Sequence, residues 1–372
     1  MIHDLLTQLP FHKNELLFGH DTTPSLVAFE IEGAERVRIF RRQGETTVSQ
    51  SEPFHPLLLL EDDSWLKGWE GEAKIERLAG DGAFRYLALF PSLKELEGAK
   101  THLQKKSGKS PMVPDAPYLY FNDPVQQYLL LSGRTHFLGL AFANLKRLQL
   151  DIETYCQPGF EFPNSARESD RISAIALADS TGWERLISGK EWDEAAMLRE
   201  MVREIRSRDP DVIEGHNLFR FDLEYIEARA RRHGVALELG RDGALLRGHP
   251  SRMQIAERTI TYRKYEIFGR HIIDTWILAQ HYDVSARELE GYGLKEIARH
   301  FGVAGPDRTY IPGDKTSWYF DHDPDTLFRY ALDDVRETRA LSELLSPSYF
   351  VEAQIFPYSY QNVALRGNAT KI

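Results

Sequence analysis

Residues 146–154, with the sequence KRLQLDIET, constrain the fold more than any other stretch of the chain. Their apolar, β-favouring pattern predicts a strand, and side chains two residues apart in a strand point to the same face. Leu150 and Ile152 would therefore anchor the strand in a core, while Asp151 and Glu153 project together from the opposite face. A sheet that contains this strand must bury one face and accommodate two adjacent carboxylates on the other.

The segments after residue 146 alternate between strand and helix patterns. Residues 171–179 and 183–188 predict two more strands, and residues 191–209 have the period of an amphipathic helix. Shorter strands and helices follow, and the last clear element is a long helix at 323–345. Three strands followed by alternating helices and strands predict an α/β fold, with a mixed sheet flanked by helices.

The first 145 residues show a separate mixed α/β pattern of short strands and helices. Residues 25–33 and 35–42 alternate as half-buried strands do. Residues 123–133 predict a helix with Asp123 as its N-cap and Gly133 at its end.

The pair Asp151 and Glu153 raises an electrostatic problem. Two carboxylates a few ångström apart repel, so that one stays protonated unless a cation lies between them. A divalent metal ion is the usual solution, because hard cations prefer oxygen ligands. For Asp-x-Glu taken alone, a solvated strand end is the simpler interpretation.

Two further groups of polar residues lie on other predicted elements. Asn217, Phe221 and Asp222 span a turn into a helix, where an acid can also be an ordinary cap or dipole partner. Tyr330 and Asp334 are four residues apart on the long helix, so they share a face. With the strand pair, four carboxylates from three elements could converge on two metal ions, the standard arrangement for cleaving phosphodiesters.

Composition limits the class of protein. The net charge of −10 and the pI of about 5.8 by themselves argue against a nucleic-acid binder, although clustered acids that bind metal would lower both. Basic clusters occur at 105–109 and 229–233, and a solvated surface is their simpler interpretation. The single cysteine, Cys156, excludes an intramolecular disulfide and a multi-cysteine zinc site. Without a long apolar run or a signal-peptide pattern, we expect an intracellular, cytoplasmic protein with no membrane segment.

The three polar groups resemble, in order and wording, the Exo I, Exo II and Exo III motifs of DEDD 3′–5′ exonucleases, in the subtype with a tyrosine in the third motif. The resemblance extends to the N-terminal half of family B DNA polymerases, such as bacterial DNA polymerase II and its archaeal relatives. It rests on the stretches DPDVIEGHNLFRFDLEYI, GRHIIDTW and YSYQNVALRGNATKI. It implies a family B N-terminal domain over 1–145 and a ribonuclease-H-like exonuclease domain over 146–342. The remaining segment, 343–372, would lead toward a palm domain and pack back on the N-terminal domain.

The resemblance also implies a role for each acid. Asp151, Glu153, Asp222 and Asp334 would bind two divalent ions, Mg²⁺ or Mn²⁺, with Asp151 bridging them and Asp222 close to the second. Tyr330 would orient the attacking water. Because the metals neutralise this cluster, we expect raised carboxylate pKa values when they are absent.

Other residues would position the substrate. Asn217 would bind the terminal nucleotides, Phe221 would stack on a frayed base, and Thr154 would contact the terminal nucleotide or be a plain strand residue. Asp274, at the end of a predicted strand, is expected to be structural. The predicted hairpin at 253–268 would either help hold the separated primer strand or be purely structural.

The expected reaction is release of deoxynucleoside monophosphates from a single-stranded or frayed DNA 3′ end, which is proofreading in a complete polymerase. No palm carboxylate motif occurs up to Ile372, so we expect a truncated, monomeric front portion that does not polymerise. The full-length protein would add a polymerase domain and a sliding clamp as partners. Two alternatives remain: a stand-alone DEDD exonuclease acting on RNA or repair intermediates, and a non-catalytic DNA-binding module.

Overall fold

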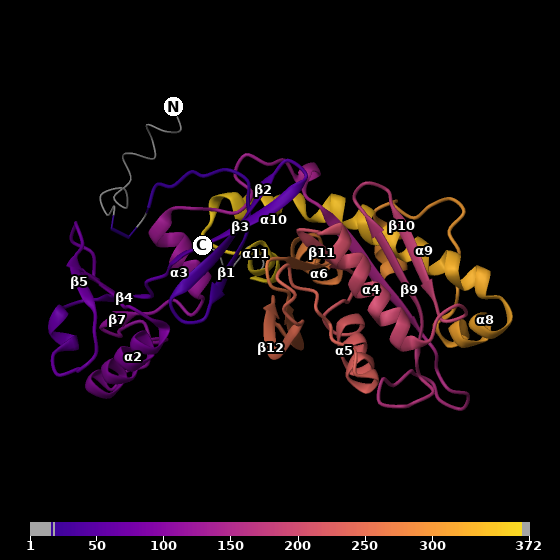
Figure 1. Cartoon of the computed structure of the whole chain (residues 1–372), viewed down its shortest axis with the longest axis horizontal. Helices are drawn as coiled ribbons and strands as arrows, with labels where there is room; N and C mark the ends of the chain where they lie inside the picture. Colours follow the sequence, from indigo (N-terminus) through magenta and orange to yellow (C-terminus); the bar gives the residue numbers. More distant parts are fainter. Residues whose placement is uncertain (1–15, 18, 367–372) are drawn as a thin grey trace. The chain divides into compact units, whose positions relative to one another are not determined.

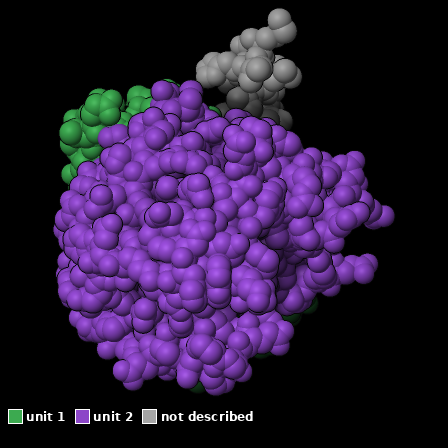
Figure 2. Space-filling model, turned by 90° about the vertical axis from the view of Figure 1, so that its right-hand side faces the viewer, with its two compact units in different colours: residues 1–140, 353–359 green, residues 141–352, 360–372 purple. Residues whose placement is uncertain are grey.

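The structure is a computed structural model, which describes residues 16–366 with the exception of residue 18 (Figure 1). The chain forms two compact units, coloured separately in Figure 2: residues 1–140 with 353–359, and residues 141–352 with 360–372. None of the helices in the described part of the chain is both long and apolar enough to cross a membrane. The first fifteen residues and the end of the expected segment 343–372, beyond residue 366, lie outside the described residues.

The first unit contains two antiparallel sheets, in the strand orders β1-β2-β3 and β5-β6-β4-β7. Its elements are β1 (Leu26–Glu32), β2 (Arg36–Gln43), β3 (Thr46–Pro53), β4 (Leu57–Leu60), β5 (Lys74–Arg77), β6 (Tyr86–Leu89), α2 (Leu93–Ser107), β7 (Tyr118–Leu119) and α3 (Pro124–Ser132). Asp123 caps α3 and Gly133 ends it with a positive φ, as predicted. The strand β3 has no signal in the sequence, since TTVSQSEP lacks apolar alternation and becomes a strand by pairing with β2.

The second unit is built on a five-stranded sheet in the order β10-β9-β8-β11-β14. The strands are β8 (Arg147–Thr154), β9 (Ile172–Asp179), β10 (Glu184–Ser188), β11 (Val212–Gly215) and β14 (His271–Asp274). β8, β9 and β10 pair antiparallel, whereas β11 is parallel to both β8 and β14. The predicted mixed sheet is therefore confirmed.

Helices of the second unit pack on both faces of this sheet. The helices that lie wholly within this unit are α4 (Glu194–Arg208), α5 (Asp222–His233), α6 (Thr275–Ala286), α7 (Leu294–His300), α8 (Thr316–His322), α9 (Pro324–Leu345) and α11 (Tyr360–Arg366). The helix α10 (Pro347–Ile355) is divided between the two units at Ala353. Leu150 and Leu177 face the main core, which includes residues of α4 and α5. On the opposite face, Ala176 and Ala178 of β9 pack against α9. Because alanine is small, α9 can lie close to the sheet on the face that carries the acids.

The structure differs from the sequence predictions at the hairpin and at the basic cluster 229–233, and it assigns the segment after residue 345. The hairpin formed by β12 (Arg247–Ile255) and β13 (Arg258–Glu266) begins earlier than the predicted residue 253, since a two-stranded ribbon has free edges that tolerate Pro250. In the basic cluster 229–233, Arg229 is buried rather than solvated. The aromatic-rich segment after 345 contains the helices α10 and α11.

The sheet core of the second unit gives a stability prediction. Leu177 is fully buried in β9, so Leu177→Ala should lower the free energy of unfolding by about 2–5 kcal/mol through lost burial and the cavity left behind. Leu344→Ala, on a side chain that is 54% exposed, should change it by no more than about 0.5 kcal/mol. Chemical denaturation followed by circular dichroism measures both, and equal losses would contradict the packing described here.

Candidate active site

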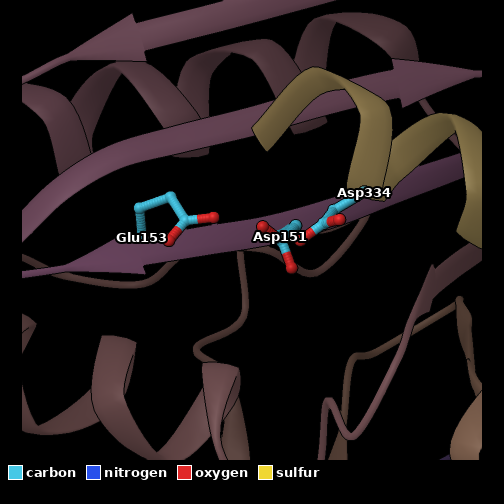
Figure 3. Close-up of side chains that lie close together, drawn as sticks. All are labelled: Asp151, Glu153 and Asp334. Carbon is cyan, nitrogen blue, oxygen red and sulfur yellow. The ribbon is translucent and has the colours of Figure 1, made fainter. Parts of the chain in front are cut away.

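Asp151 and Glu153 project from β8 on the face that α9 covers, and Asp334 comes from α9 itself. Figure 3 shows the three side chains with the Glu153 carboxylate turned toward the other two. One oxygen from each carboxylate lies within 4.8 Å of one from each of the others. In the β8–β9 ladder, Ala176 is directly opposite Asp151 and Ala174 is opposite Glu153. Because alanine is small, these cross-strand neighbours leave room beside the two acids.

Asp222 approaches the same strand from α5. Its Oδ1 atom accepts a hydrogen bond of 3.2 Å from the backbone N–H of Ile152, the residue between the two strand acids. The side chain is almost fully buried. Thus the sheet and the start of α5 bring a fourth carboxylate against the strand that carries the pair, as the order of the sequence groups predicts.

Two basic residues outside the three sequence groups also reach this cluster. Lys295 of α7 places Nζ 2.9 Å from Asp334 Oδ2, and the guanidinium of Arg308 binds the other oxygen of Asp334. Arg308 Nε also lies 2.7 Å from Glu337 Oε1. No sequence signal marks either residue, because each lies in a separate segment that only the tertiary structure brings to α9.

Burial and mutual repulsion raise the pKa values of the acids. Burial is the main cause for Asp151 and Glu153, and the nearby Asp334 charge raises both further. Burial raises the pKa of Asp222 to about 8. The pKa of Asp334 is also raised by burial, although Lys295 and Arg308 oppose the shift. The expectation of a carboxylate cluster with raised pKa values is confirmed.

The donor set fits a divalent metal ion. Asp151 Oδ2 is buried and has no hydrogen-bond partner among the described residues. Leaving such an atom unpaired is costly, and a hard cation would satisfy it together with the adjacent oxygens of Glu153 and Asp334. The oxygen-only chemistry of the cluster suits Mg²⁺ or Mn²⁺ rather than a metal that prefers sulfur or imidazole.

Tyr330 lies one helical turn before Asp334 and is almost completely buried. The Nζ atom of Lys295 lies 4.3 Å from the centre of its ring. Burial raises the pKa of the Tyr330 hydroxyl, so this group keeps its proton at neutral pH. Its position on α9 therefore places an O–H group beside the acidic cluster.

The turn that carries Asn217 is held by Asp274. Asn217 has a positive φ of 64°, and its backbone N–H donates to Asp274 Oδ1 at 2.8 Å. Asp274 Oδ2 accepts from Phe219 N–H at 3.2 Å, and Oδ1 also caps α6 through Trp276 N–H. Burial raises the pKa of Asp274 to about 6 against these hydrogen bonds. The Asn217 side-chain oxygen is buried without a partner among the described residues, so it is available to a bound molecule.

Phe221 and Thr154 lie in different surroundings. Phe221 lines an open cavity of about 510 Å³, together with Phe160, Phe162 and Arg220. Thr154 is buried at the end of β8, beside an irregularity in its pairing with β9. The cavity suits the expected role of Phe221, whereas the surroundings of Thr154 do not distinguish its two interpretations.

Comparison with known proteins points to one family. Residues 134–297 match the family model described as "DNA polymerase family B, exonuclease domain". A DNA polymerase of Pyrococcus glycovorans is 26% identical over 347 residues, which cover 87% of this chain and 42% of that protein. DNA polymerase 2 of Aeropyrum pernix is 28% identical over 207 residues, which cover 55% of this chain and 23% of that protein.

Among solved structures, the family B DNA polymerase from the hyperthermophilic archaeon Pyrobaculum calidifontis has a similar fold. The TM-score is 0.71 at 23% identity, and the match covers 91% of this chain and 47% of that one. The chain thus spans less than half the length of each of these relatives. The resemblance inferred from the three sequence groups is confirmed.

The raised pKa values predict how the stability of the metal-free protein depends on pH. A carboxyl group with a higher pKa in the folded state than in the unfolded state binds its proton more tightly when folded, so its contribution is lost as pH rises. For Asp222 the window runs from the ordinary value of 3.8 to about 8. The thermal midpoint of the metal-free protein should therefore fall between about pH 5 and pH 8. Asp222→Asn should flatten this fall, and Mn²⁺ at the upper pH should reverse it in the wild type.

Thermal denaturation of the wild type and of Asp222→Asn, each with and without Mn²⁺, measures these effects. Asp325→Asn, on an exposed side chain of α9, is the control and should keep the wild-type slope. The assignment fails if Asp222→Asn and Asp325→Asn have the same pH dependence.

Proposed function

Because residues 134–297 carry the exonuclease domain of the DNA polymerase B family, we propose that this chain is a metal-dependent 3′→5′ exodeoxyribonuclease. It removes nucleotides from a DNA 3′ end as deoxynucleoside monophosphates, which is the proofreading reaction of a polymerase. One observation carries the proposal: the cluster of Asp151, Glu153 and Asp334, with an unpaired buried oxygen on Asp151. All four acids of the three sequence groups are present, which favours a catalytic domain over a non-catalytic DNA-binding module.

The acids divide into two groups by their surroundings. Asp151, Glu153 and Asp334 would hold the ion nearer the attacking water, and Asp151 with the adjacent Asp222 would hold a second. Bound metal ions lower the pKa of water and stabilise charge that develops on the phosphate. Since the four carboxylates come from β8, α5 and α9, the sheet and its packed helices fix their separation.

Tyr330 and Lys295 act beside this cluster. The protonated Tyr330 hydroxyl donates a hydrogen bond to the attacking water and sets its direction toward the phosphate. Lys295 pairs with Asp334 and so offsets part of the carboxylate repulsion when the site holds no ion. The structure thus supports a role for Lys295 that the sequence alone did not suggest.

The substrate strand lies in the cavity beside Phe221. Its aromatic lining offers faces on which bases of an unpaired strand can stack, without regard to base identity. Arg167 and Arg220 line the same cavity, but so do Glu161 and Glu224, so attraction of phosphate is weak there. Stacking is therefore the main source of affinity, and a paired 3′ end must first fray. Asn217, and Thr154 at the end of β8, contact the terminal nucleotide.

The remaining proposals concern the whole protein. The N-terminal domain spans 1–145, the exonuclease domain 146–342, and the segment 343–372 leads toward a polymerase palm. The full-length protein works inside the cell on DNA, with its own polymerase domain and a sliding clamp as partners. The lengths of the relatives support this arrangement, since this chain corresponds to less than half of each.

The first test is hydrolysis of 5′-labelled single-stranded DNA with Mg²⁺ or Mn²⁺. We expect products shortened stepwise from the 3′ end, and no products when the metal is removed with a chelator. The double variant Asp151→Ala, Glu153→Ala should lower the rate by about 10³-fold or more, because it removes two of the four metal ligands. Asp325→Asn should retain wild-type activity. Undiminished activity in the double variant would exclude this site.

A second test distinguishes DNA from RNA as the substrate, since a stand-alone DEDD exonuclease acting on RNA is the main alternative. Single strands of the same sequence, one of each chemistry, are compared by kcat/KM. The family match favours DNA, and we expect a preference of about tenfold or more, because 2′-OH groups require space or partners of their own. Faster hydrolysis of RNA would support the alternative.

A further inference from the structure

The loop of residues 156–170, between β8 and β9, has no regular secondary structure, yet it presents large aromatic side chains to solvent. Phe160 is 53% exposed and Phe162 is 70% exposed. Both line the cavity next to Phe221, and Arg167 stacks over the Phe160 ring at 3.9 Å. For such a loop to offer a stacking surface, its backbone must be held in one conformation although no strand or helix holds it.

Asp170, which is fully buried, holds one part of the loop backbone. Its carboxylate accepts hydrogen bonds from Gln157 N–H at 3.0 Å and Asn164 N–H at 2.8 Å, two backbone groups from separate parts of the loop. Arg167 Nε donates to it at 2.8 Å. The hydroxyl of Tyr225, which lines the cavity, donates to the Asp170 carbonyl at 2.7 Å. The loop is thus folded around a buried negative charge that satisfies its N–H groups.

Arg229 of α5, which is 1% exposed, holds a second part of the loop backbone. Its Nε and one Nη2 hydrogen donate to the two oxygens of Glu194 at 2.8 and 2.6 Å. Its Nη1 group donates to the carbonyls of Ser165 and Arg167 at 3.2 and 2.7 Å, and Nη2 to that of Glu168 at 3.1 Å. A guanidinium has five N–H donors, and these five bonds use all of them.

We propose that Arg229 is a positioning residue for the substrate strand, because it fixes the loop 156–170 and so aligns Phe160 and Phe162 with Phe221 along the cavity. The inference rests on the proposed function and adds to it a residue outside the three sequence groups. Arg229 lies on α5, the helix that begins at Asp222. The same helix therefore carries one of the proposed metal-binding acids and holds the loop that lines the cavity beside Phe221, which we call the strand site.

The geometry requires arginine at this position. A lysine has three donors at a single point, so it cannot reach Glu194 and three carbonyls that lie in different directions. Arg229→Lys would remove the guanidinium donors from the carbonyls of Ser165, Arg167 and Glu168, and the loop would gain alternative conformations. The acidic cluster, held by β8, α5 and α9, does not depend on these carbonyls.

Arg241 provides a matched control, because it is also an arginine in this unit and its side chain is only 5% exposed. It pairs with Asp209 at 2.9 Å and Asp211 at 2.7 Å, and donates to the Gly269 carbonyl at 2.6 Å. Asp209 and Asp211 precede β11, and Gly269 precedes its parallel neighbour β14, whereas Asn217 and Phe221 follow the carboxyl end of β11. Arg241→Lys therefore removes a comparable buried network without touching the loop.

The experiment compares two substrates, the p-nitrophenyl ester of thymidine 5′-monophosphate and single-stranded oligonucleotides of increasing length. Hydrolysis of the ester depends on the acidic cluster alone, whereas hydrolysis of the oligonucleotides also depends on binding in the cavity beside Phe221. In Arg229→Lys we expect KM for oligonucleotides to rise about tenfold, the loss of roughly one stacked base, with kcat/KM for the ester unchanged. In Arg241→Lys both substrates should behave as in the wild type. Equal effects of the two variants on oligonucleotide KM, or an unchanged KM in Arg229→Lys, would overturn the proposal.

A structural readout separates failure of this inference from failure of the proposed function. Hydrogen exchange of the loop amides, including Asn164, should become faster in Arg229→Lys but not in Arg241→Lys, whether or not the protein hydrolyses DNA. If the wild type hydrolyses neither substrate, the proposed function fails. Slow exchange that persists in Arg229→Lys would overturn the positioning role by itself.

Discussion

Repulsion among buried carboxylates is the constraint around which the second unit is organised. Asp151, Glu153, Asp222 and Asp334 come from three elements and meet on one face of a sheet, where burial disfavours their charges. Lys295 and Arg308 both bind Asp334, and two cations offset at most two of the four carboxylate charges. The unpaired Asp151 oxygen and the remaining repulsion suit this site to a divalent metal ion, which would satisfy that oxygen and offset carboxylate charge.

The sheet meets this constraint through an unequal division of its two faces. Leucine and isoleucine side chains of β8 and β9 fill the core on one side. Alanines of β9 stand opposite the acids on the other, so α9 can approach and bring Asp334 and Tyr330 with it. A larger residue at Ala174 or Ala176 would occupy the space next to the carboxylates. The site therefore depends on the small alanine side chains of β9 as well as on the two acids of β8.

Irregular segments around the site are held by buried charged side chains rather than by secondary structure. Asp274 binds the turn that carries Asn217, while Asp170 and Arg229 bind the loop with the exposed aromatic residues. In each case a charged group satisfies several backbone groups that no strand or helix could pair. This arrangement gives the turn of Asn217 and the loop 156–170 a fixed shape while leaving the aromatic side chains of the loop exposed.

The sequence by itself determined the main elements and the order in which the acids occur. The alternation in residues 146–154 fixed which side chains share a face, and the four-residue spacing of Tyr330 and Asp334 did the same on α9, because these periods are local properties of the backbone. Only the tertiary structure decided that Lys295 and Arg308 reach Asp334 and that Arg229, within an apparently solvated basic run, is buried. Those contacts join residues from 26 to more than 60 positions apart, and nothing in a local pattern encodes which distant carboxylate or carbonyl will satisfy a given cation.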